Sequence, residues 1–271
     1  MKKYWSIIRR NRVILGILII ILSLLAGYLI YIRNNQVLPQ AAIGFLDDVK
    51  LPQNGQKVLV FSPHPDDETI GAGGYIYDSE KNGAEVKIVL VTNGNKHHLE
   101  DRRYQEFRQA ASILGVKEEN LIFLGYPDGH LTDENKEVLV QQFQKIIDEA
   151  APDIIIYPSE RDSHPDHSFT GQIVETVLSQ ESSQRLAYAY LVHHRHWPQP
   201  KKMALNLYIL PPMKLINFDD SWEKLILDQE TSRKKFEAVS AYKSQLRVPI
   251  LRSLILSQVR ANELFAIENS Q

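Results

Sequence analysis

Short apolar runs alternate with amphipathic segments from about residue 56 to residue 158. The apolar runs, rich in Val, Ile and Leu, lie at 57–62, 85–92, 121–124 and 153–157. Between them, apolar residues recur every three or four positions, which predicts helices at 69–79, 102–114 and 135–149. Near-continuous apolar strands that alternate with such helices indicate a Rossmann-like α/β fold, a mostly parallel sheet with helices on both faces.

The pattern is weaker beyond residue 185. Segments 186–193 and 203–210 are compatible with strands, and 222–245 has the spacing of an amphipathic helix. The tail after Val248 favours neither helix nor strand. The last third of the chain is therefore less defined than the rest.

One segment near the N-terminus is apolar on all sides. Residues 13–32 contain no charge, and 20 residues at about 1.5 Å each span about 30 Å of hydrocarbon. Five basic residues precede this run and only Arg33 follows it closely, so the positive-inside bias predicts a cytoplasmic N-terminus and an external segment 34–271. A cleaved signal peptide is the alternative, but its apolar part is usually shorter and no small-x-small site closes this run.

The chain therefore divides into four predicted parts. A basic cytoplasmic N-terminus (1–12) leads into a single transmembrane anchor (13–32), a linker (33–55) and an α/β domain (56–271). The predicted location is the cell membrane, with the α/β domain outside the cytoplasm.

Composition narrows the chemistry. Hydrophobic residues make up 44% of the 271, which is enough for a packed core. The net charge of -2 argues against nucleic acid as a partner. Because there is no cysteine, disulfides, iron–sulfur clusters, thiolate zinc sites and cysteine nucleophiles are excluded. Any metal must be held by His, Asp or Glu. The absence of cysteine also fits an exported bacterial protein.

Two segments carry most of the candidate chemistry, and each lies just past a predicted strand. The first is 63–68 (PHPDDE), after the strand at 57–62, and the second is 164–167 (HPDH), shortly after the strand at 153–157. Loops at the carboxyl ends of parallel strands meet at one crevice. The two segments can therefore share a site if their strands are neighbours.

Together these segments offer a metal site and two further groups. His64, Asp67 and His167 supply two imidazoles and one carboxylate, a ligand set that leaves positions open for water and substrate. Asp66 is left over and can accept a proton from the attacking water. His164 is also left over, and as an imidazolium it can stabilise an oxyanion or protonate a departing amine. These groups suit the hydrolysis of an amide.

A structural role is the alternative for either segment alone. His-Pro-Asp is common in turns, where the aspartate caps the following helix. The occurrence of both segments after apolar strands favours the functional interpretation.

The same residues resemble a known family. Segments 64–68 and 164–167 are similar to motifs of the PIG-L/LmbE-like zinc-dependent N-acetylglucosamine de-N-acetylases. Softer matches lie between and beyond them, and the resemblance covers about residues 56–246. These matches are 92–94 (TNG), Arg103-x-x-Glu106, 124–125 (LG), 128–129 (DG) and 242–245 (YKSQ).

By position, the resemblance implies a role for each of these residues. His64, Asp67 and His167 would be ligands of one Zn²⁺ per chain, Asp66 the general base, and His164 the residue that stabilises the oxyanion or assists the leaving group. Other divalent metals also suit such ligands.

The resemblance also implies substrate contacts and contains one departure. Arg103 and Asp128 fall where the family contacts sugar hydroxyls, although an ordinary ion pair or turn is their structural alternative. Some members place a tyrosine two residues before the HPDH segment, where it polarises the carbonyl; here that residue is Asp162. The His-rich segment 193–196 (HHRH) could line the pocket or hold a second metal, and a solvated strand end is the commoner use of such a run.

The sequence thus predicts a membrane-anchored, extracytoplasmic, zinc-dependent deacetylase with an LmbE-like domain at 56–271. Its substrate would be a GlcNAc-type sugar in a glycolipid, a lipid-linked saccharide or a cell-wall glycan, and the lipid bilayer would be its partner through the N-terminal helix. Hydrolysis of a different amide, or a non-catalytic membrane-tethered glycan-binding domain, is the alternative.

Overall fold

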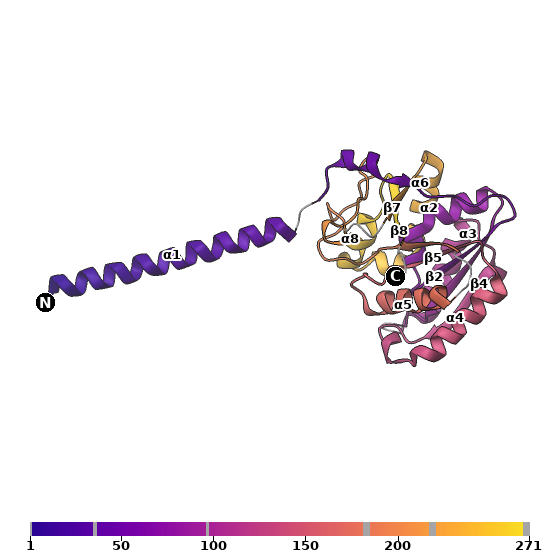
Figure 1. Cartoon of the computed structure of the whole chain (residues 1–271), viewed down its shortest axis with the longest axis horizontal. Coiled ribbons are helices and arrows are strands. Elements are labelled where there is room, and N and C mark those ends of the chain that lie inside the picture. Colours follow the sequence, from indigo (N-terminus) through magenta and orange to yellow (C-terminus); the bar gives the residue numbers. More distant parts are fainter. Residues whose placement is uncertain (1, 35–36, 96–97, 181–184, 217–220, 268–271) are drawn as a thin grey trace. The chain divides into compact units, whose positions relative to one another are not determined.

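The computed structural model describes residues 2–34, 37–95, 98–180, 185–216 and 221–267. The chain forms two compact units, Met1–Val37 and Leu38–Gln271. The first contains a single helix, α1 (Lys2–Asn34) (Figure 1). Its stretch from Asn11 to Tyr31 has a mean hydropathy of 2.9 and no buried residue. It is long and apolar enough to cross a membrane, and a signal sequence has the same properties.

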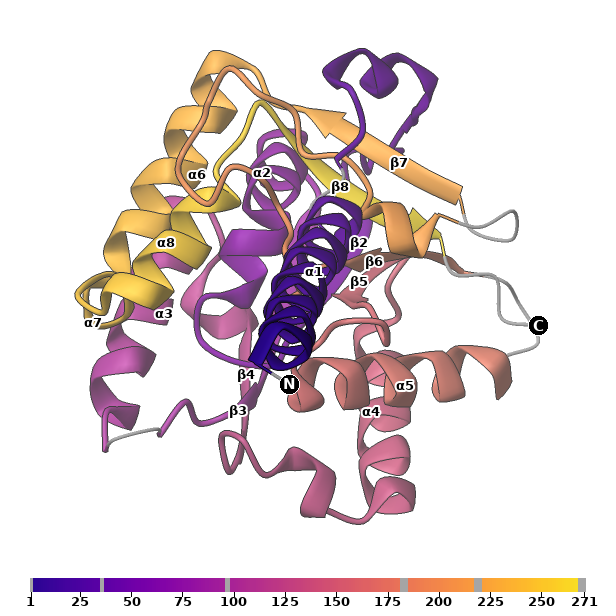
Figure 2. The ribbon, with the colours of Figure 1, turned by 90° about the vertical axis from the view of Figure 1, so that its left-hand side faces the viewer.

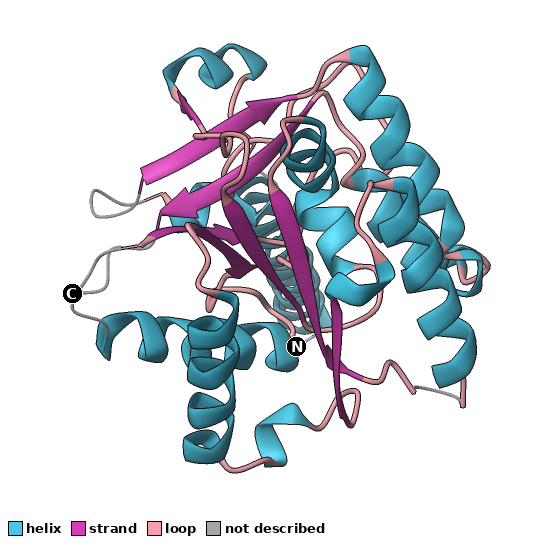
Figure 3. Ribbon diagram, turned by 90° about the vertical axis from the view of Figure 1, so that its right-hand side faces the viewer, coloured by secondary structure: helices cyan, strands magenta, loops and turns pink. Residues whose placement is uncertain are grey.

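The second unit is built on one mixed eight-stranded sheet (Figure 3). Its strand order is β1-β7-β8-β6-β5-β2-β3-β4. The five strands from β6 to β4 are parallel, whereas β8 runs antiparallel to both β6 and β7. The strands are β1 (Asp47–Asp48), β2 (Lys57–Ser62), β3 (Glu85–Thr92), β4 (Leu121–Tyr126), β5 (Ile154–Pro158), β6 (Leu186–Tyr190), β7 (Ser221–Ile226) and β8 (Asn262–Ile267).

Helices cover both faces of this sheet (Figure 2). The core on one face includes residues of α2, α3, α6 and α8, and the core on the other includes residues of α4 and α5. Along β2, Val58 and Val60 face the first core, while Leu59 and Phe61 face the second, because successive side chains of a strand alternate. The α-helices of this unit are α2 (Asp67–Lys81), α3 (Glu100–Ile113), α4 (Lys136–Ala150), α5 (Pro165–Gln180), α6 (Gln229–Ala241), α7 (Lys243–Leu246) and α8 (Pro249–Ser257).

The predicted elements up to residue 158 are confirmed. The strands at 57–62 and 85–92 are found with the predicted bounds, and the others agree to within about two residues. These strands are apolar throughout because helices cover both faces of the sheet, so that side chains on either face are buried.

Two predictions in the last third are wrong. Segment 203–210 is not a strand: the amide of Ile209 bonds to the side chain of Asn262 rather than to a neighbouring strand. Segment 222–245 is not one helix, because it begins with strand β7. Helix α6 starts only after Asp228, whose carboxylate caps it by accepting the amide of Thr231.

Candidate active site

Loops that follow parallel strands converge at one edge of the sheet. Strand β2 lies between β5 and β3, so the segment after β2 is flanked by the segments after both neighbours. Helix α5 comes close to the loop after β5 at Gly171, where an added Cβ would lie 2.4 Å from the Pro158 carbonyl oxygen. This close packing brings the start of α5, with His167, to the end of β2.

The three predicted metal ligands lie together. His64 Nδ1 is 3.0 Å from Asp67 Oδ2 and 3.2 Å from His167 Nε2, and His167 Nε2 is 2.9 Å from Asp67 Oδ2. Ligand atoms around a tetrahedral zinc ion are about 3.3 Å apart, given bonds of about 2.0–2.1 Å. All three residues are buried. The spacing and the donor types both fit a small divalent cation.

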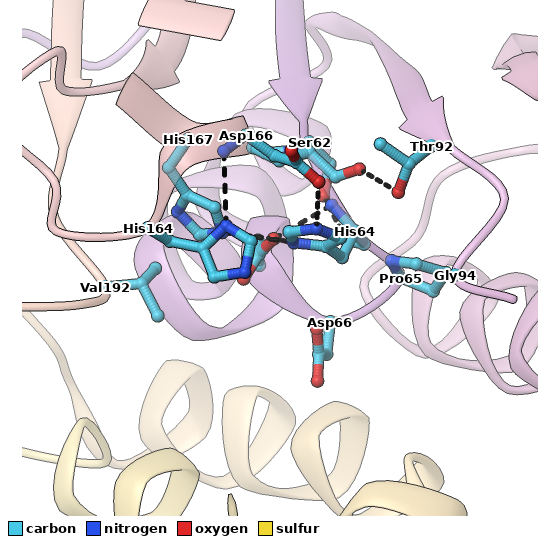
Figure 4. Close-up of polar contacts among 12 residues, drawn as sticks. Ser62, His64, Pro65, Asp66, Thr92, Gly94, His164, Asp166, His167 and Val192 are labelled. Carbon is cyan, nitrogen blue, oxygen red and sulfur yellow. Dashed lines mark hydrogen bonds and ion pairs between the residues drawn. The ribbon is translucent and has the colours of Figure 1, made fainter. Parts of the chain in front are cut away.

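Two further carboxylates orient the imidazoles. Asp166 lies 3.0 Å from His64 Nε2 and accepts the backbone amides of Gly129 and Leu131 (Figure 4). Asp162 lies 3.3 Å from His167 Nδ1. A proton on each of these ring nitrogens leaves the opposite nitrogen, the one facing Asp67, free as a ligand.

The charges of this cluster suit a cation. Burial by itself lowers the pKa of His64, but hydrogen bonds to Asp166 and Asp67 outweigh it and raise the pKa to about 9. Burial also lowers the pKa of His167, and the charges of Asp67 and Asp162 raise it well above the usual value. Burial raises the pKa of Asp67, but the two imidazoles hold it well below its ordinary range. The negative charge that keeps these imidazoles protonated also favours a metal ion in the place of the protons.

Asp66 precedes helix α2 in a strained conformation. Its φ is 133°, a backbone angle that residues other than glycine rarely adopt. Its amide donates to Glu68 and its carbonyl accepts the amide of Ile70. Its carboxylate lines the same cavity as His64 and points toward the C-terminal helices (yellow in Figure 4). Strain of this kind persists where surrounding contacts hold it, commonly at functional sites.

Burial makes Asp66 a stronger base than a free aspartate. It raises the pKa of the carboxyl to about 8, although the Arg103 guanidinium 3.4 Å away opposes the change. Asp67 and Glu68 add to the rise because they carry like charge.

Arg103 connects three loops and reaches Asp128. It donates to Asp128 at 3.1 Å and to the carbonyl oxygens of Pro65 and Gly94. Its Nε atom is buried and has no hydrogen-bond partner among the described residues. Arg103 and Asp128 both line the cavity, where the sequence predicts contacts with sugar hydroxyls.

His164 lies beside the ligand cluster, as the sequence predicts. Its ring centroid is 4.7 Å from that of His64, and its Nδ1 accepts the backbone amide of Asp166. Burial, together with the charges of His64 and His167, lowers its pKa to about 4. Because Nδ1 accepts this amide, a neutral ring carries its proton on Nε2, from which it can donate a hydrogen bond.

Sequence reasoning missed the role of Asp162, and it offered a place in the pocket for the segment with His193 only as one of its alternatives. Asp162 is buried and accepts the backbone amides of His164, Val192 and His193, so it ties the loop after β5 to the segment after β6. His193 lines the cavity, and its ring lies 4.6 Å from that of His167. Only the His-rich run at 193–196 signals this placement. Ligand atoms of Asp67, His167 and His193 lie within 4.8 Å of one another, so these three could also hold a metal ion. Among the described residues, neither His194 nor His196 belongs to such a group.

The cavity has a volume of about 490 Å³ and two unlike sides. The polar side is lined by His64, Asp66, Asp67, Arg103, Asp128, His164, His193, Ser244 and Gln245. The other side is aliphatic and comes largely from the C-terminal helix α8. This side was also missed, because the tail after Val248 shows no clear periodicity.

Comparisons with known proteins identify the family of this chain. The sequence profile described as "PIG-L: GlcNAc-PI de-N-acetylase" matches residues 59–178. A probable N-acetyl-alpha-D-glucosaminyl L-malate deacetylase 2 from Bacillus anthracis is 30% identical over 160 residues, which cover 53% of this chain and 70% of that protein. Diacetylchitobiose deacetylase from Thermococcus kodakarensis is 33% identical over 128 residues, 43% of this chain and 46% of the relative. The chain thus spans about half the length of that relative.

A solved structure shares the fold. The N,N'-diacetylchitobiose deacetylase of Pyrococcus horikoshii superimposes with a TM-score of 0.58 and 24% identity, over 78% of this chain and 84% of that one. On the sequence evidence, the chain belongs to the PIG-L family.

Proposed function

We propose that this protein is a metal-dependent deacetylase that hydrolyses the N-acetyl group of a GlcNAc-type sugar and releases acetate. One observation carries the proposal: two imidazoles and a carboxylate converge within 3.2 Å beside a further buried carboxylate, that of Asp66, which lines the cavity and lies 3.4 Å from the Arg103 guanidinium. The relatives named above are deacetylases of GlcNAc-containing compounds, which supports the same reaction class here.

Zinc is the proposed metal, with His64, Asp67 and His167 as its ligands. A divalent cation at such a site acts as a Lewis acid on a carbonyl oxygen and lowers the pKa of water. His and carboxylate ligands suit zinc, and the orienting carboxylates Asp162 and Asp166 are typical of metal-bound histidines.

The other polar residues of the cavity transfer the protons and bind the sugar. Asp66 takes the proton of the attacking water, for which its raised pKa suits it, and returns this proton to the departing nitrogen as the C–N bond breaks, so that acetate and a free amine leave. His164 donates a hydrogen bond to the amide oxygen as negative charge develops there. Arg103 and Asp128 bind sugar hydroxyls. Position 162, where some family members have a tyrosine, is Asp162 here and faces His167 and His193. In this proposal the metal and His164 therefore polarise the carbonyl.

The N-terminal helix supports a membrane location for this activity. We propose that residues 13–32 of α1 form the anchor, with 1–12 in the cytoplasm, 33–55 as the linker and the catalytic domain outside. This arrangement favours a glycolipid, a lipid-linked saccharide or a cell-wall glycan as substrate. A reporter active in only one compartment, fused to the C-terminus, tests the orientation, and a cytoplasmic signal would overturn it.

The reaction is tested with the full chain in nanodiscs and a panel of acetylated saccharides. We expect acetate and a free amine as products, loss of both after chelation, and recovery with zinc. Hydrolysis of a different amide from the same panel would support the alternative enzyme. Saccharide binding without any hydrolysis by the metal-loaded protein would favour a glycan-binding domain.

A further inference from the structure

Helix α8 gives the cavity an aliphatic wall. Ile250, Leu251, Leu254 and Ile255 all line it, together with Val248 just before the helix. Their spacing puts the four helical residues on one face, and that face is turned to the same cavity as His64 and Asp66. The wall is therefore continuous with the candidate active site.

Exposure increases along this wall. Ile255 is 3% exposed, Leu254 and Leu251 are partly buried, and Ile250 at the start of the helix is 81% exposed. The aliphatic surface thus leads from the interior to solvent. Val248, which also lines the cavity, is 44% exposed, so Ile250 and Val248 together continue the aliphatic surface to the mouth of the cavity. Contiguous exposed apolar surface of this kind marks ligand-binding grooves.

From this wall we propose an apolar aglycone subsite: the amino sugar carries an aliphatic chain at its anomeric carbon, and that chain packs along α8. The inference rests on the proposed deacetylation and selects a chain-bearing glycoside over an unsubstituted cell-wall glycan. The cavity volume of about 490 Å³ is in the range of sites for drug-sized ligands and leaves room beyond one sugar.

The aliphatic chain of the substrate belongs on the aglycone rather than on the amide that is cleaved. Hydrolysis requires the amide to lie at the cluster of His64, Asp67 and His167, which are at most 6% exposed. His64 and Asp67 form the floor of the cavity, and His167 contacts both from behind it. The group that follows α8 toward Ile250 must be the part that leads outward. In this arrangement the acetyl group lies at the floor of the cavity, and the substituent on the anomeric carbon packs against the aliphatic wall.

The length of the aliphatic substituent is the direct test. The full-length protein in nanodiscs is given methyl, hexyl and decyl glycosides of GlcNAc below their micelle concentrations, and kcat/KM for acetate release is measured. We expect at least about tenfold higher kcat/KM for decyl than for methyl, since each buried methylene contributes up to about fourfold. Equal values would overturn the subsite but leave the deacetylase proposal intact.

Ile250→Ser assigns the effect to α8. It should remove most of the chain-length advantage and leave the methyl glycoside unaffected. Val138→Ser is the matched control, because Val138 is also exposed in the first turn of a helix and lies outside the cavity. If the chain-length advantage survives Ile250→Ser, the assignment to α8 is overturned. If Ile250→Ser removes the advantage only for substrates embedded in vesicles, the assignment is also overturned, because α8 then binds the bilayer.

Two further measurements separate the subsite from the reaction. Calorimetric binding of decyl glucosaminide, the expected product, tests the wall even if no substrate is hydrolysed, and binding no tighter than methyl glucosaminide would contradict the subsite. Methyl N-decanoyl-glucosaminide places the chain on the amide. Faster hydrolysis of this compound than of decyl GlcNAc would show that the wall binds the acyl group, contrary to the proposal.

Discussion

The floor and the aliphatic wall of the cavity are built in opposite ways. On the floor, charged side chains are buried and each is held by others, as Asp166 holds His64 and Asp162 holds the loop that carries His164. On the wall, aliphatic side chains of α8 make no specific polar contact and become exposed toward Ile250. The floor can fix the position of reacting atoms, whereas the wall can contribute only contact area. Changes to the floor should therefore alter the reaction itself, and changes to the wall should alter only the choice of substrate.

The largest effect is expected from loss of a proposed ligand. His167→Ala should lower bound zinc below one per chain and reduce acetate release at least about 10³-fold, because the metal chemistry is lost. Metal content by mass spectrometry, with kcat/KM on the same sample, measures both. His130→Ala, an exposed histidine outside the cavity, is the control. Full zinc content in His167→Ala would remove it from the ligand set.

Asp66→Asn should separate proton transfer from metal binding. We expect about 10²–10⁴-fold lower kcat with zinc content unchanged, since the amide cannot act as a base. Asp148→Asn, an exposed acid on α4, should match the wild type. Acetate release by Asp66→Asn at the wild-type rate would exclude Asp66 as the base.

The floor was largely predictable from the sequence, and the wall was not. His64 and Asp67 follow a strand whose apolar run is unmistakable, and a parallel sheet brings the ends of neighbouring strands together regardless of their separation along the chain. Helix α8 has no such constraint, since PILRSLILS is apolar on more than one side and its partner surface comes from elsewhere in the fold. Strand β7 was hidden because SWEKLI fits a helical spacing as well as an alternating one.

Asp162 shows a different limit. A single aspartate in a loop before HPDH is compatible with a turn, and only the fold brings the segment after β6 against it. Its carboxylate is held in place by contacts made about 30 residues away in sequence, with the amides of Val192 and His193. Such a role depends on tertiary packing and has no local signature.

Asp162→Asn tests whether orientation of the histidines matters to the floor. We expect about 10–100-fold weaker zinc affinity, because the substitution removes the negative charge beside His167. Competition with a chelator measures this affinity independently of activity. Asp153→Asn is the control, since Asp153 also accepts a backbone amide, that of Lys57, but outside the cavity. Unchanged affinity would limit Asp162 to a structural role.

The smallest effect is expected at the contact that joins the floor to the C-terminal helices. Tyr242, between α6 and α7, donates a 2.5 Å hydrogen bond to the buried carboxylate of Glu68. Glu68 in turn accepts from Ser62 and from the strained amide of Asp66. Tyr242→Phe leaves these last two bonds in place, so we expect a loss of about 1–3 kcal/mol in the free energy of unfolding and a modest fall in kcat.

Tyr77→Phe provides the comparison for that contact, because Tyr77 makes a similar bond to Glu230 at an exposed position. Its removal should cost no more than about 0.5 kcal/mol. Equal effects of the two substitutions in chemical denaturation would mean that the Glu68 network does not stabilise the floor. If Tyr242→Phe lowers kcat while KM for the decyl glycoside stays constant, the C-terminal segment influences the reaction through Asp66 independently of the aliphatic wall.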